Sequence, residues 1–141
     1  NILISGDMLL PRITSNVSVL APNPDGNPLA LFLASIEALR ELPENTLVLP
    51  SHGIPFHGLH ARIDQLQAHH HERCNALRGA CGEAMCAGDL LPVLFDREIT
   101  DAHQTMFAMG ETIAHLNYLE HAGALRRIDD EDGSIRFVRT H

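Results

Sequence analysis

Two short apolar segments, each followed by a loop and then by a helical pattern, constrain the fold more than any other feature. Ile2–Ser5 ends at Gly6, and Thr46–Leu49 ends at Pro50. Short apolar or β-branched runs between turn residues are typical of buried strands. The first loop, residues 6–28, is rich in Pro, Asn, Asp and Gly and is expected to be long and irregular. The order strand, helix, strand, helix predicts an α/β layer.

Two helices are expected after these strands. Pro28 is preceded by a capping asparagine and suits a first helical position, so a helix should run from there until Pro43 stops it. Over Leu59–Leu77, apolar residues recur at spacings of three and four, which places them on one helical face. Gly79 and Gly82 are expected to end this second helix.

The second half of the chain has a different pattern. Its expected elements, in chain order, are a short helix over Asp89–Asp96, a longer helix that Asp101 caps and Gly123 ends, and strands over Leu125–Ile128 and Ile135–Val138. A stripe of Met106, Met109 and Ile113 on the longer helix is expected to be core. Helix, short helix, longer helix and hairpin is the order of a winged helix. We therefore expect an α/β domain over residues 1–80 and a small α+β winged-helix domain over residues 81–141.

The composition excludes several classes of protein. The chain has 18 Asp or Glu against ten Arg and no Lys, and its net charge of −8 argues against a nucleic-acid backbone or an anionic membrane as the main partner. There is no apolar run of about 18 residues, so no membrane-spanning helix is expected. Three cysteines cannot close a full disulfide framework, and free thiols predict a reducing, cytoplasmic location.

Polar residues that follow the two strands are the first candidates for a functional site. Asp7 comes directly after Gly6, and His52 lies two residues after Pro50. In α/β layers, functional groups gather at the carboxyl ends of strands. An aspartate oxygen and a histidine nitrogen can both bind a divalent metal such as zinc. Spacing alone leaves three readings open, namely a shared metal site, a turn or cap role for Asp7, and simple exposure of His52.

Longer segments around these two residues resemble a known family. Ile4–Asp7 with Leu9–Ile13, and Leu49–Pro55, resemble the C-terminal half of a metallo-β-lactamase-fold hydrolase. Gly58–Ile63 and Met109–Thr112 resemble the glyoxalase II-like and β-lactamase-like subgroup that carries an appended winged-helix domain. The resemblance extends over nearly the whole chain. It implies part of an αββα metallo-β-lactamase sandwich followed by the winged helix.

The resemblance also implies a site that holds two metal ions, usually zinc. Asp7 matches the aspartate that bridges both ions, and His52 matches the last histidine ligand. Metal-bound hydroxide is then expected to attack a thioester or ester substrate. A ribonuclease-type enzyme of the same fold, and a winged-helix module for interaction or nucleic-acid binding, are the alternatives.

The family's ligand set is incomplete in this sequence. Its His-x-His-x-Asp-His run, which lies upstream of the Gly-Asp pair, does not occur here, so Asp7 and His52 are the ligands that remain. The chain also begins with Asn1 rather than Met. We therefore expect a C-terminal fragment of a hydrolase, which binds zinc poorly and is inactive by itself.

Three residues near the two loops are further candidates. Arg12 could contact a substrate anion, and His57 and His60 are close in sequence to His52, so all three are candidate substrate contacts. The alternatives are that Arg12 braces its loop and that the two histidines are exposed, cap a helix or support a metal ligand. The triplet His69–His71 is not expected to share a metal ion, because consecutive helical residues point about 100° apart.

The expected partners follow from charge and family. From residue 87 onward there are ten acidic residues and five Arg, a net of −5, which disfavours nucleic acid. The expected partner is a small-molecule thioester or ester, with no membrane; a homodimer is left open.

Overall fold

The computed structural model describes all residues from Asn1 to His141. Their contacts divide them into two compact units. The first unit comprises Asn1–Asn16 and Ala30–His69, and the second comprises Val17–Leu29 and His70–His141. This grouping is by contact rather than by position in the sequence, so it differs from the contiguous domains predicted over 1–80 and 81–141.

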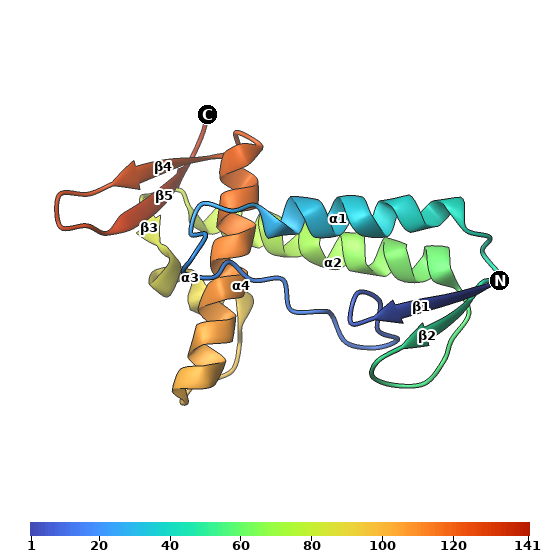
Figure 1. Cartoon of the computed structure of the whole chain (residues 1–141). Helices are drawn as coiled ribbons and strands as arrows, with labels where there is room; N and C mark the ends of the chain where they lie inside the picture. Colours follow the sequence, from blue (N-terminus) through green and yellow to red (C-terminus); the bar gives the residue numbers. More distant parts are fainter. The chain divides into compact units, whose positions relative to one another are not determined.

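The first unit contains the predicted strand–helix alternation. Strand β1 (Ile2–Gly6) lies parallel to β2 (Leu47–Pro50) (Figure 1). Helix α1 (Pro28–Ala38) begins at the predicted proline and continues as a 3-10 turn over Leu39–Glu41. Helix α2 (Leu59–Ala80) ends between the two predicted glycines and runs from the first unit into the second. The elements of this half are confirmed.

The core of the first unit lies between the two strands and the two helices. Its fully buried members are Leu9, Ile36, Val48, Leu59, Ile63 and Leu66. Each such side chain contributes roughly 1.5–3 kcal/mol by leaving water. Strand β1 turns only one face to this core, because Ile2 and Ile4 are 68% and 80% exposed. The prediction that this segment is a fully buried strand is therefore wrong for its outer face.

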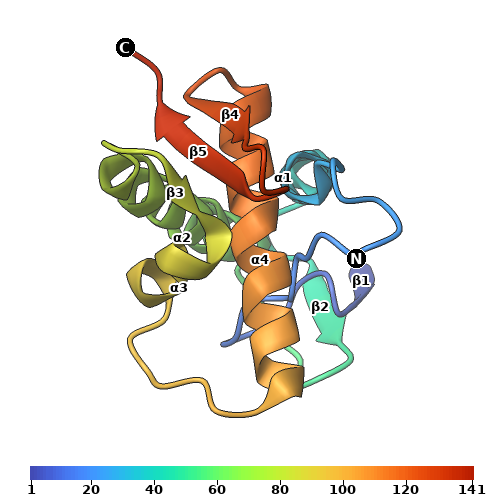
Figure 2. The same cartoon turned by 90° about the vertical axis from the view of Figure 1, so that its left-hand side faces the viewer.

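The second unit holds three helical segments and a three-stranded antiparallel sheet. Its elements are the end of α2, β3 (Met85–Cys86), α3 (Ala87–Leu94), α4 (Ala102–His121), β4 (Leu125–Asp129) and β5 (Ile135–Arg139). Strand β5 lies between β3 and β4 (Figure 2). The side chain of Asp101 accepts a hydrogen bond from the Gln104 amide and so caps α4 as predicted. Strand β3 was not predicted.

Part of the predicted long loop belongs to the second unit. The Val19 amide donates to the Gly110 carbonyl of α4 at 3.0 Å. The Asn117 side chain donates to the carbonyls of Pro24 and Gly26, both at 2.9 Å. Segment Val17–Leu29 therefore packs on α4, the helix that directly precedes the C-terminal hairpin in the chain.

Polar side chains of α2 and α4 meet inside the second unit. His70 Nδ1 and His115 Nε2 lie 3.0 Å apart, and both rings are almost fully buried. His115 Nδ1 donates to the Glu111 carbonyl at 2.8 Å, and the Glu111 carboxylate lies 3.5 Å from Arg73. We call His70, Arg73, Glu111 and His115 the buried polar cluster.

One helical stripe is less buried than the sequence predicted. Met106 is exposed, and Met109 and Ile113 are only partly buried, so the expectation that all three are core is wrong. No helix is both long enough and apolar enough to cross a membrane.

Candidate functional site

The parallel pairing of β1 and β2 brings two polar residues to one end of the sheet. Gly6 is opposite Pro50, and the Ser51 amide donates to the Gly6 carbonyl at 3.0 Å. Gly6 has a φ of +55°, which glycine adopts without strain, so the chain can turn directly after the strand. Asp7 and His52 follow these paired positions and therefore lie side by side, as the sequence predicted.

The two side chains are close and open to solvent. His52 Nε2 lies 3.5 Å from Asp7 Oδ1, and the side chains are 71% and 74% exposed. The Ser51 hydroxyl donates to the same Asp7 oxygen, which fixes the carboxylate. The Ser15 hydroxyl donates to the Asp7 carbonyl and holds the backbone at this point. The geometry leaves lone pairs of the carboxylate and the imidazole accessible.

The Asp7–His52 spacing fits two ligands of one zinc ion. Nitrogen and oxygen ligands at about 2.1 Å in a tetrahedral arrangement lie about 3.4 Å apart, close to the observed 3.5 Å. The donor types, a carboxylate and an imidazole, are also ones that zinc accepts. No group of three or more His, Cys, Asp or Glu in the chain is placed to hold a metal ion. Asp7 and His52 thus match part of a metal centre.

The loop after β1 and the loop after β2 are in direct contact. Gly53 has a φ of +86°, and a Cβ atom placed on it would lie 2.6 Å from Pro11 Cγ. A larger residue at this position would be strained and would push the two loops apart. Gly53 therefore allows the loop that carries His52 to lie against the loop that follows Asp7.

Arg62 of α2 fixes the loop that follows Asp7. Its Nε donates to the Leu10 carbonyl at 2.7 Å, and its Nη2 donates to the Ile13 carbonyl at 2.9 Å. Partial burial lowers the pKa of Arg62, but an arginine remains protonated in proteins. Neither Arg62 nor Ser51 was predicted as a site residue. Ser51 could have been noticed as the neighbour of His52, whereas Arg62 has no local signal of this role.

A cavity lies beside His52 within the first unit. Its volume is about 340 Å³, and its lining residues are Pro11, Arg12, Ile13, His52, Gly53 and Ile54. We call it the His52 cavity. It includes one of the three predicted substrate contacts, Arg12.

The other two predicted contacts lie elsewhere. His57 Nδ1 is 3.2 Å from the Asn45 carbonyl, and His60 Nε2 is 2.9 Å from the Leu42 carbonyl. His60 Nδ1 also lies 3.0 Å from the Glu44 carboxylate. These partners precede β2, whereas His52 follows it, because the chain doubles back along the strand and pairs Phe56 with Val48. Neither His57 nor His60 lines the His52 cavity.

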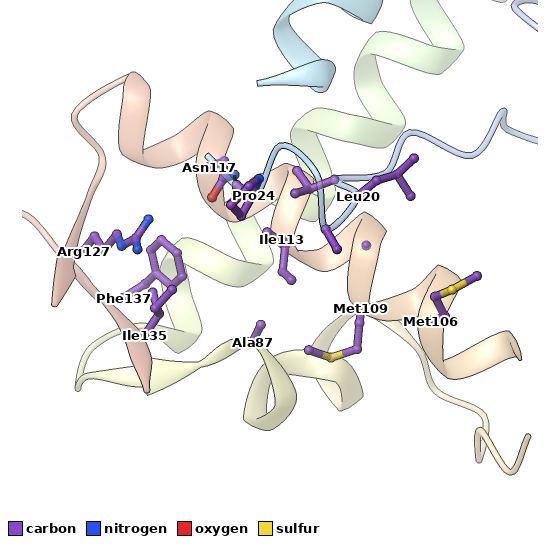
Figure 3. Close-up of a pocket in the computed structure, with 13 residues that line it drawn as sticks. Leu20, Pro24, Ala87, Met106, Met109, Ile113, Asn117, Arg127, Ile135 and Phe137 are labelled. Carbon is purple, nitrogen blue, oxygen red and sulfur yellow. Dashed lines mark hydrogen bonds between the residues drawn. The ribbon is translucent and has the colours of Figure 1, made fainter. Parts of the chain in front are cut away.

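The second unit contains a separate apolar cavity of about 330 Å³ (Figure 3). Side chains of α4, β5 and segment Val17–Leu29 surround it, among them Met109, Ile113 and Phe137. Arg127 is its charged lining residue and is already paired with Asp25 at 2.6 Å and Asp129 at 2.8 Å. This cavity therefore offers apolar surface but no free cation.

The C-terminal part of the chain matches a protein family. Residues 74–140 match the family model described as metallo-beta-lactamase-like, C-terminal domain. This part of the chain is therefore similar to a metallo-beta-lactamase-like domain. No curated protein sequence matches the chain.

Two solved structures extend the similarity to nearly the whole chain. A beta-lactamase domain protein from Burkholderia ambifaria is 50% identical with a TM-score of 0.94, and the match covers 99% of this chain and 41% of that one. A metallo-beta-lactamase family protein from Thermus thermophilus is 32% identical with a TM-score of 0.82, over 99% and 42% of the two chains. The chain thus spans about two fifths of each. It resembles the C-terminal part of the metallo-beta-lactamase fold, as the sequence predicted.

Proposed function

We propose that this chain supplies the C-terminal part of a zinc-dependent hydrolase and contributes Asp7 and His52 to its metal centre. The observation that carries this proposal is the 3.5 Å approach of the two side chains at the ends of parallel strands. The family match and the two similar structures support the hydrolase class. Since a zinc ion takes about three or four protein ligands, the rest would come from residues outside this chain.

Each residue of the site has a definable task in this proposal. The Ser51 hydroxyl donates to Asp7 Oδ1 and orients the carboxylate, whose remaining lone pairs stay available to a metal ion. His52 presents Nε2 towards the same point and binds as the neutral imidazole. Bound zinc supplies polarisation of the scissile carbonyl and activation of water. The hydrogen bonds of Arg62 and the close approach of Gly53 to Pro11 keep the two loops in position.

The proposed substrate is a small thioester or ester rather than a nucleic acid. Helix α4 carries no Lys or Arg, and residues 87–141 carry five more negative than positive charges, ten against five. A phosphate backbone needs cationic neutralisation, which this surface does not provide. The order of α2, β3, α3, α4, β4 and β5 supports a winged-helix assignment for this part of the chain. The three free cysteines support a reducing, cytoplasmic location.

Zinc titration of the chain tests the proposal. We expect weak binding, with well under one ion retained after gel filtration, because only two ligands are present. Asp7→Ala and His52→Ala should each weaken the calorimetric zinc affinity at least tenfold, and zinc should shift the His52 ring signals in NMR spectra. His71→Ala, which changes an exposed histidine of the triplet, is the matched control and should leave the affinity unchanged. Zinc binding that neither Asp7→Ala nor His52→Ala alters would contradict the proposal.

A further inference from the structure

Arg12 is an exposed cation without an ion-pair or hydrogen-bond partner, and it lines the His52 cavity. Other arginines of the first unit are engaged. Arg40 pairs with Glu37 and Asp64, and Arg62 is bonded to backbone carbonyls. A guanidinium presents several donors in a fixed planar fork that suits carboxylate and phosphate oxygens. Arg12 is therefore free to bind an anion beside the proposed zinc ligand His52.

The turn that carries Arg12 is fixed before any ligand binds. The carbonyls on either side of it, those of Leu10 and Ile13, accept hydrogen bonds from Arg62. One residue earlier, the Leu9 carbonyl accepts from the Ser5 hydroxyl at 2.8 Å. Binding then costs little additional ordering of the backbone, which favours affinity.

Apolar surface faces the same cavity from both loops. Ile13 and Ile54 line it, and they are 62% and 68% exposed. The volume of about 340 Å³ lies within the usual range for small-molecule sites, roughly 300–1,000 Å³. One cation and two exposed isoleucines together match a ligand that has an apolar chain and one anionic group.

We propose that the His52 cavity binds the part of the substrate that carries a short apolar chain and a carboxylate or phosphate. Arg12 pairs with the anion, and Ile13 and Ile54 contact the chain. This inference rests on the proposed hydrolase function, since it assigns the cavity to the substrate of the site at His52. It narrows the substrate from any small thioester or ester to one whose acyl or alcohol part carries both a short apolar chain and an anionic group.

The test is an NMR titration of the metal-free chain with four simple probes. Hexanoate and hexyl phosphate carry both features, hexanamide lacks the charge, and acetate lacks the chain. We expect the two amphipathic anions to shift the amide signals of Gly53 and Ile54 at lower concentration than hexanamide or acetate. The relative affinities of hexanoate and hexyl phosphate tell which anion the site prefers. Equal shifts by hexanamide and hexanoate would overturn the role of charge.

Matched variants locate the two contacts. Arg12→Gln should weaken hexanoate binding about fivefold, as expected for one exposed ion pair, and leave hexanamide unchanged. Arg126→Gln, which also removes an exposed arginine, is the control and should have no effect. Ile54→Ala should weaken hexanoate and hexanamide alike, whereas Ile2→Ala, which alters an equally exposed isoleucine on β1, should weaken neither.

The outcomes separate this inference from the hydrolase proposal. If hexanoate shifts no signal of the cavity, or binds Arg12→Gln as well as the unaltered chain, the substrate assignment is wrong. The zinc titration with Asp7→Ala and His52→Ala is a separate measurement, so zinc dependence on these residues can persist when the cavity binds no anion. Loss of both results would contradict both proposals.

Discussion

The two units place their polar side chains in opposite environments. In the first unit, Asp7 and His52 meet at the ends of two parallel strands and are mostly exposed. In the second unit, His70 and His115 meet between two helices and are almost fully buried. The first arrangement leaves the donor atoms of both side chains accessible to a ligand. In the second arrangement a ring nitrogen of one histidine is hydrogen-bonded to a ring nitrogen of the other.

The contrast follows from the elements that carry these residues. A strand end leads into a loop at the surface, so side chains placed there stay hydrated unless something covers them. Residues on the inner face of a packed helix lose water and must find partners within the protein. Two neighbouring polar side chains are therefore accessible to a ligand in the first unit, whereas the two neighbouring histidines of the second unit are buried within the protein.

The largest expected effect comes from replacing one histidine in each unit by leucine. His115→Leu should lower the free energy of unfolding by about 1–3 kcal/mol, because it leaves a buried nitrogen of His70 without its partner. His52→Leu should change it by no more than about 0.5 kcal/mol, because the side chain is exposed. Urea unfolding of both variants measures the difference. Similar losses in the two variants would contradict the assigned environments.

A pair of glycine substitutions sharpens the contrast between close packing and open surface. On Gly110 of α4 a Cβ atom would lie 2.9 Å from Ser18 Cβ and 3.1 Å from the Val19 carbonyl, so Gly110→Ala should cost about 1 kcal/mol in spite of better helix propensity. Gly79 of α2 has no atom within 4 Å of this position. Gly79→Ala is thus the control and should stabilise by about 1 kcal/mol. Thermal unfolding should show a lower melting temperature for Gly110→Ala and a higher one for Gly79→Ala than for the unaltered chain.

The smallest effect concerns the titration of the buried polar cluster. Burial raises the pKa of Glu111 above its ordinary value of 4.5, and the charge of Arg73 opposes this only in part. The folded state then binds the Glu111 proton more tightly than the unfolded chain does. Glu111 therefore stabilises the folded state below pH 4.5, and this stabilisation is lost as the pH rises through the raised pKa.

We expect the stability of the unaltered chain, relative to Glu111→Gln, to fall as pH increases from 4.5 towards neutrality. Unfolding curves of both proteins at several pH values give the difference between their free energies of unfolding. The contributions of the other titrating groups are nearly the same in both proteins and largely cancel in this difference. A difference that stays constant or rises with pH would show that Arg73 outweighs the effect of burial.

Most elements of the fold could be predicted because their signals are local. The Pro28 start of α1, the Asp101 cap of α4 and the β4–β5 hairpin each follow from a few neighbouring residues. Strand β3 could not be predicted, since its two residues, Met85–Cys86, are a strand only by pairing with β5. The exposure of Ile2 and Ile4 was also missed, because an apolar run does not tell whether one or both faces are covered.

The part of the candidate site that lies at the ends of strands could be predicted from the sequence. Asp7 and His52 were expected to meet because each follows a strand of the same layer, and they do. His57 lies only five residues from His52, but the reversal of the chain along β2 carries it to the other end of the strand. The partner of His70 was not predictable, since His115 is 45 residues away.

Segment Val17–Leu29 has a consequence for synthesis of the chain on the ribosome. Its hydrogen bonds to Asn117 join residues 93 and 91 positions apart. Translation proceeds at roughly 5–20 residues per second, so the segment emerges several seconds before helix α4 exists to receive it. Its apolar residues that are buried in the folded chain, such as Val17 and Leu29, are not yet covered by the second unit during that time. Folding of the second unit therefore finishes only after the C-terminal residues have been made, and slower translation would lengthen the exposure of this early segment.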